Sequence, residues 1–134
     1  MRNRVLSEKN EFYLPKEEFL TALHFALQYP NWVRELQTEP DTSKAITYDG
    51  DKVQTSGGYD AAAETAMRRY TLERKKKLVE GTVREVAPEI YDYLLLSVAY
   101  GWTFWQLQVK GMPCSKNTFY ILRRKFYYEL GKKM

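Results

Sequence analysis

Residues 103–130 carry the pattern that most restricts the fold of this chain, because two helix starts are separated by a tight turn. Thr103 followed by Gln106 is a capping box, in which each side chain binds the free backbone N–H of the other residue. Pro113 ends the short helix, since proline lacks an N–H donor and disfavours the α conformation in the residue before it. Ser115 then offers a second N-cap. The segment therefore predicts a short helix, a turn and a longer helix.

The longer helix has an apolar side and a cationic side. Its apolar stripe has helical spacing and consists of Phe119, Leu122, Phe126 and Leu130. The cationic side is formed by Lys116, Tyr120 and Arg124, with Asn117 and Arg123 near its edges. A dry side that docks on a scaffold helix, opposite a cationic and amide-bearing side, is what a DNA recognition helix needs. An ordinary basic surface helix that ends a helical bundle fits the same pattern.

The distribution of charge favours the C-terminal half as a surface for a polyanion. The 134 residues carry a formal net charge of +4. Residues 1–60 hold 7 basic and 10 acidic side chains, whereas residues 61–134 hold 14 basic and 7 acidic ones. Excess positive charge of this kind attracts nucleic acid.

The rest of the chain predicts a mainly α protein, a helical bundle with a C-terminal helix-turn-helix. Helices are expected over residues 15–28, 31–36, 59–86 and 89–100, the last being the apolar scaffold helix. Gly81 favours a kink or a break inside the long helix. The three expected parts are an N-terminal helical segment (1–36), a linker or small β-hairpin (37–58, with the strands near 45–55) and a basic helix plus helix-turn-helix domain (59–134).

The long helix contains a dense basic run made of Arg68, Arg69, Arg74, Lys75, Lys76 and Lys77. Such a run is either a solvated helix face or a set of phosphate contacts that add salt-dependent, sequence-independent affinity. A long helix is also suited to dimerisation, so a homodimer through residues 59–86 is a further expectation.

Catalysis is not expected, because the residues that usually carry it are isolated. The chain has one histidine, His24, and one cysteine, Cys114, and it lacks the common hydrolase and metal-binding motifs. We expect no cofactor and no metal. Trp105, in the first turn of the short helix, could be partly exposed; a core or edge aromatic is favoured there over a base or phosphate contact. A single cysteine, no long apolar run and no secretory signal predict a cytoplasmic protein without a membrane partner.

The order of these elements resembles a known family. A basic helix is followed by an apolar helix that contains LLL and ends in YG, then by a threonine-capped short helix, a turn with Pro and Ser, and NTFYxxRRKF. This order is similar to the C-terminal part of small phage transcriptional regulators of the RinA and ArpU kind, which resemble the helix-turn-helix of sigma-70 region 4. The resemblance covers roughly residues 53–131. It implies binding to double-stranded DNA and control of phage genes without catalysis, and it is compatible with contact to RNA polymerase.

These considerations give a set of expected DNA contacts. The expected base contacts are Asn117, Tyr120 and Arg124. The expected phosphate contacts are Lys116, Arg123 and Lys125, together with the basic run at 68–77. The alternative is a helical protein-interaction module, or a phage assembly or packaging adaptor, without sequence-specific DNA binding; its basic helices and numerous aromatic side chains would contact a protein.

Overall fold

A computed structural model describes residues 9–38 and 61–134, which are mainly helical and contain no β-strand within these ranges. The helices are α1 (Lys16–Leu27), α2 (Tyr29–Gln37), α4 (Ala61–Val86), the short 3-10 helix η2 (Pro88–Ile90), α5 (Tyr91–Tyr100), α6 (Phe104–Lys110) and α7 (Lys116–Lys133). The helical bundle that the sequence predicts is confirmed. The linker or hairpin expected over residues 37–58 lies, from residue 39 onward, outside the described residues.

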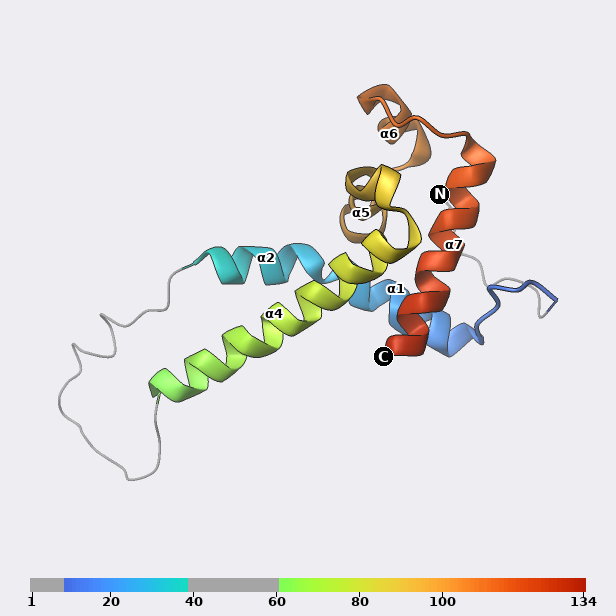
Figure 1. The fold of residues 1–134 in the computed structure, drawn as a ribbon. Helices are drawn as coiled ribbons and strands as arrows, with labels where there is room; N and C mark the ends of the chain where they lie inside the picture. The colour runs from blue at the N-terminus through green and yellow to red at the C-terminus, as the bar shows by residue number, and fades with distance from the viewer. Residues whose placement is uncertain (1–8, 39–60) are drawn as a thin grey trace.

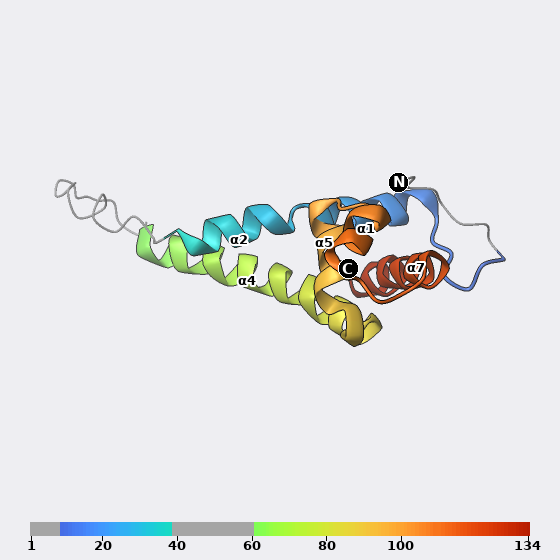
Figure 2. The ribbon, with the colours of Figure 1, turned by 90° about the horizontal axis from the view of Figure 1, so that it is seen from above.

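The described residues form a helical body from which a two-helix arm projects (Figures 1 and 2). The arm consists of α2 and residues 61–77 of α4, which run side by side in opposite directions. The second half of α4 enters the body, where Val79 and Val83 are fully buried. The body contains α1, α5, α6 and α7, and α7 lies on the side away from the arm.

Two arginines of the basic run hold the arm together. The Arg69 guanidinium donates hydrogen bonds to the backbone carbonyls of Leu36 (2.9 Å) and Thr38 (3.0 Å) at the end of α2. The last carbonyls of a helix have no partner inside the helix, so this contact satisfies groups that would otherwise depend on water. Arg68 binds both carboxylate oxygens of Glu35, at 2.8 and 2.9 Å. These two side chains therefore join α4 to α2.

The start of the second helix and the course of the long helix differ from those expected. The second helix begins at Tyr29 rather than at Asn31, and Pro30 lies in its first turn, where proline loses no helical hydrogen bond. The long helix continues through Gly81 without a break. A glycine inside a helix costs only about 1 kcal/mol, which the packing of the neighbouring Thr82 and Val83 offsets.

Helix α5 is the scaffold around which the body packs. Leu94 and Val98 are fully buried, and α1, α2, α4, α6 and α7 all contact this helix. Gly101 ends α5 with a left-handed backbone (φ 75°), as expected for a glycine C-cap. No helix within residues 9–38 and 61–134 is both long and apolar enough to span a membrane.

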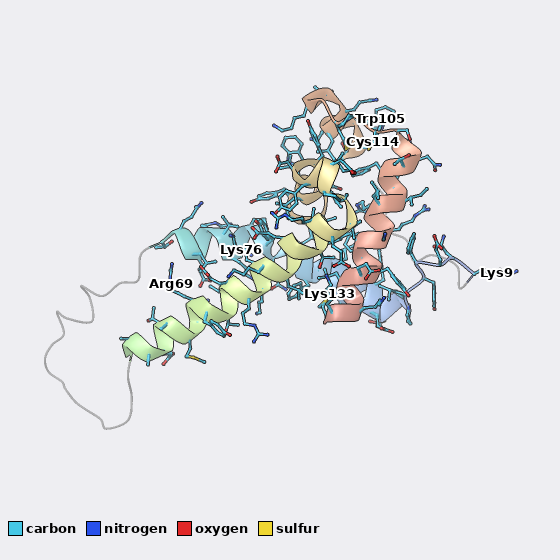
Figure 3. The ribbon with its side chains drawn as sticks, in the orientation of Figure 1. Lys9, Arg69, Lys76, Trp105, Cys114 and Lys133 are labelled. Carbon is cyan, nitrogen blue, oxygen red and sulfur yellow. The ribbon has the colours of Figure 1, made fainter. Side chains whose placement is uncertain are left out.

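The C-terminal end of α7 is attached to α4. The Lys133 ammonium lies 2.6 Å from Glu85 Oε1 and donates a hydrogen bond to Thr82 Oγ1 at 3.2 Å (Figure 3). This ammonium group lowers the pKa of the Glu85 carboxyl. The last turn of α7 is thereby held in the body, whereas its first turn follows α6 at the opposite end of the helix.

Burial of tyrosines should make the fold sensitive to alkali. Tyr29 is buried, its hydroxyl donates a hydrogen bond to Glu80, and burial raises its pKa far above the ordinary value of about 10. The folded state therefore holds the Tyr29 proton more tightly than the unfolded state does. The free energy of unfolding keeps its full contribution from the protonated Tyr29 below pH of about 10, and this contribution is lost as pH rises above that value. Denaturant unfolding of the wild type should show this decline, and Tyr29→Phe should make it shallower. Equal declines in both proteins would contradict the assignment.

Candidate nucleic-acid interface

The two helix starts that the sequence predicts are both present. The Thr103 N–H donates to Gln106 Oε1 (2.8 Å) and the Gln106 N–H donates to Thr103 Oγ1 (3.2 Å), which completes the capping box of α6. Gly111 ends α6 with a left-handed backbone (φ 115°). Ser115 Oγ then accepts the Thr118 N–H at 3.2 Å and caps α7. The direction of α7 is therefore set by local contacts on both sides of the turn.

Aromatic packing fixes α6 against α7. Phe104 is buried, and its ring centroid lies 5.9 Å from that of Phe119, which is also buried. Leu107 on α6 and Met112 in the turn fill the adjacent space. The apolar stripe of α7 is thus the side that docks on the body, as the sequence predicts.

The opposite side of α7 is exposed over its first turns and carries five of the six DNA contacts expected on this helix, whereas Tyr128 further along that side is half-buried against Phe12. Lys116, Asn117 and Arg124 are exposed. Tyr120 and Lys125 are half-buried at the two edges of this surface, and Tyr120 packs against Phe119. The structure therefore brings together the three expected base contacts and two of the expected phosphate contacts on one side of α7.

Arg123 does not belong to this exposed surface. Only 9% of the residue is accessible, Nε donates to Ser97 Oγ at 3.3 Å, and the guanidinium lies 5.0 Å from the centre of the Tyr127 ring. At 3.6 residues per turn, Arg123 lies about 40° around the helix from Phe119 and hence at the border of the apolar stripe. The expected phosphate contact at Arg123 is therefore wrong, since its charged group is buried between α5 and α7.

Truncation of the two neighbouring arginines should change the free energy of unfolding by very different amounts. Arg123→Ala should lower the free energy of unfolding by about 2 kcal/mol or more, because a buried side chain and its hydrogen bond are lost. Arg124→Ala, on the exposed side, should change it by about 0.5 kcal/mol or less. Urea denaturation of both variants measures the difference. A more stable Arg123→Ala than Arg124→Ala protein would contradict the assigned orientations.

The basic run of the arm divides into engaged and accessible side chains. Arg68 and Arg69 contact α2, and the Lys76 ammonium lies 3.3 Å from a carboxylate oxygen of Glu80. Lys75 is half-buried, whereas Arg74 and Lys77 are exposed. The arm projects away from α7, so the expected phosphate contacts of the arm and of α7 form two separate surfaces (Figures 1 and 2).

The C-terminal region contains a long interval of sequence without acidic residues. Between Asp92 and Glu129 the chain has five basic residues and no acidic one. This interval comprises most of α5, all of α6, the turn and most of α7. With the Arg123 guanidinium buried, Lys110, Lys116 and Arg124 are the exposed cations of this interval and form the positive end of the body. Lys125 is half-buried and lies near Glu85, whose pKa it helps to lower. This interval is visible in the sequence and locates the excess positive charge more narrowly than the net charges of residues 1–60 and 61–134 do.

Trp105 is exposed at the edge of the body, so of the expected core and edge positions it takes the edge position. Its accessible fraction is 60%, and the Lys116 ammonium lies 5.3 Å from the centre of its ring. The first turn of α6 and the first turn of α7 therefore meet at this pair of side chains. Figure 3 shows Trp105 at the end of the body that carries α6 and the turn.

The residues considered for catalysis lie apart from one another. Cys114 is half-buried in the turn, and burial raises the pKa of its thiol, so the thiol is protonated at neutral pH. His24 is exposed on α1. Within residues 9–38 and 61–134, no three His, Cys, Asp or Glu side chains are grouped as metal ligands would be.

Comparison of the chain with models of protein families, with curated proteins and with solved structures finds no match. The positive end of the body, together with the exposed side of α7, is the candidate interface. It offers cations, an amide and aromatic side chains, which are the groups that bind nucleic acids.

Proposed function

We propose that this protein is a DNA-binding transcriptional regulator that inserts the exposed side of α7 into the major groove. The observation that carries the proposal is the composition of that side. Lys116, Asn117 and Arg124 are exposed there, within an interval of the chain that has no carboxylate. Because DNA carries phosphates along both edges of each groove, these exposed cations attract the duplex to the side of α7 that carries the amide.

Asn117 and Arg124 are the side chains best suited to recognise bases. They lie seven positions apart, close to two helical turns, and therefore point to the same side of α7. A carboxamide pairs with the N6 and N7 positions of adenine, and a guanidinium pairs with the O6 and N7 positions of guanine. Tyr120, half-buried at the edge, adds a hydroxyl and a ring edge to this set.

Phosphate contacts would come from the cations that border the base-reading side chains. Lys116 precedes Asn117, and Lys125 lies at the other edge of the helix. Arg74 and Lys77 on the arm add cations that are accessible to a second stretch of backbone. Regulation of phage genes, and contact with RNA polymerase while bound to DNA, belong to the same proposal through the resemblance of residues 53–131 to phage regulators.

A protein-interaction module is the second candidate, and the arm favours it. Met67 and Tyr70 on α4 are 63% and 59% accessible. Exposed aromatic and methionine side chains are enriched in protein interfaces, so the arm is suited to a protein partner or to a second copy bound through α4. In that case the positive end of the body would have no preference for DNA.

Retention of duplex DNA across a salt series tests the proposal. Each phosphate contact should contribute about −0.9 to the slope of log affinity against log salt concentration, so binding to random duplex should weaken steeply between low and moderate salt. Lys116→Gln should reduce the slope by about 1. Lys132→Gln, at the far end of α7, is the matched control and should leave the slope unchanged. Absence of binding to duplex DNA at low salt would overturn the proposal and favour the protein partner.

A further inference from the structure

An exposed tryptophan lies beside the first cation of α7. The chain has three tryptophans, of which Trp32 is buried and Trp102 is half-buried, whereas Trp105 is 60% accessible. The Lys116 ammonium lies 5.3 Å from the centre of the Trp105 ring, within the range of a cation–π contact. The two side chains come from different helices and share one surface.

The position of this pair is fixed by the body beneath it. Phe104 is buried next to Trp105, and the two ring centroids are 5.1 Å apart in an edge-on arrangement. The capping box at Thr103 fixes the start of α6, and the cap at Ser115 fixes the start of α7. The indole and the ammonium are therefore presented together at a constant place relative to the base-reading side of α7.

We propose that Trp105 and Lys116 form a binding site for the sugar–phosphate backbone at the edge of the groove that α7 enters. The ammonium would pair with a phosphate, while the indole would lie against the adjacent deoxyribose and offer its Nε1–H as a further donor to a phosphate oxygen. This inference rests on the proposed DNA binding and adds α6 to the interface.

The chemistry of the surroundings favours a backbone contact over a base contact. Trp105 is on α6, which packs beside the first turn of α7 rather than on its base-reading side. Val109, one turn further along α6, is 90% accessible and extends the apolar surface that a deoxyribose would meet. Contacts to the backbone fix the orientation of a recognition helix but carry no direct sequence information. Trp105 is thus a positioning residue for α7.

Tryptophan fluorescence during titration with a duplex tests this inference on the full chain. The emission of the wild type should change on binding, and Trp105→Phe should abolish most of that change. Trp102 is the matched control, because Lys110 lies 5.8 Å from its ring centre in a similar cation–aromatic pair. Trp102→Phe should therefore retain the change.

Affinity measurements complete the test. Trp105→Ala should weaken binding to every duplex sequence alike, by roughly fivefold to tenfold, and Trp105→Phe should weaken it less. The thermal midpoint of Trp105→Ala should equal that of the wild type, because the side chain is exposed.

The possible results separate the inference from the proposed function. Wild-type binding with unchanged Trp105 fluorescence and full affinity of Trp105→Ala would overturn the inference and leave the role of α7 intact. A loss in Trp105→Ala that differs between DNA sequences would also overturn it, since a base contact would then be present. Failure of the wild type to bind any duplex at low salt would overturn the proposed function and this inference together.

Discussion

Replacing Asn117 and Arg124 with alanine should abolish most of the preference of this protein for one DNA sequence over another. Each side chain is exposed on the same side of α7, and a bidentate contact to a base contributes about 1–3 kcal/mol of discrimination. The residual binding should be the salt-dependent, sequence-independent part, because Lys116 and Lys125 are retained. Competition between a selected site and random duplex measures the preference of each protein.

A matched control for the double variant is available within α7 itself. Lys132 is exposed and lies beyond the base-reading side chains, near Glu129 at 3.7 Å. Lys132→Ala should therefore leave the sequence preference as it is in the wild type. An unchanged preference in the double variant, with circular dichroism showing a folded protein, would remove both residues from the base-reading set.

Phe119→Ala should produce the largest loss of stability among substitutions in α7, about 3–5 kcal/mol in the free energy of unfolding. Phe119 is fully buried, and its ring packs against Phe104 of α6. Truncation would leave a cavity where the two helices meet the body, so urea denaturation should show a much lower midpoint.

Ile121→Ala is the comparison, because this side chain lies on the opposite side of the same helix and is 43% accessible. It should change the free energy of unfolding by about 0.5 kcal/mol or less. Equal losses in Phe119→Ala and Ile121→Ala would mean that α7 docks on the body through a different side from the one described.

The features that the sequence predicts correctly are those encoded by neighbouring residues. The capping box at Thr103, the cap at Ser115 and the glycine end at Gly101 each depend on residues within one helical turn, so their chemistry is visible without a structure. The apolar stripe through Phe119 and Phe126 is likewise a local periodicity, and both residues are fully buried.

The features that the sequence does not predict depend on contacts between distant segments. Arg69 donates hydrogen bonds to carbonyls at the end of α2, and Arg68 binds Glu35, so both arginines of the expected phosphate-binding run make structural contacts with α2. Arg123 lies at the border of the apolar stripe, where helical spacing alone does not decide between burial and exposure. Its partner Ser97 is on α5, twenty-six positions earlier in the chain, so helical spacing within α7 does not reveal the contact.

Site-directed photo-cross-linking tests the assignment of α7 as the DNA-binding helix most directly. A photoreactive reagent would be attached to Ile121→Cys, in the middle of the exposed side of α7, with Cys114→Ser as background. Met67→Cys, similarly exposed on the arm, carries the same reagent as the control. With duplex DNA at low salt, we predict strong cross-linking from position 121, its loss at high salt and much weaker cross-linking from position 67. Binding of DNA without a cross-link from position 121, or a stronger cross-link from position 67, would contradict the assignment.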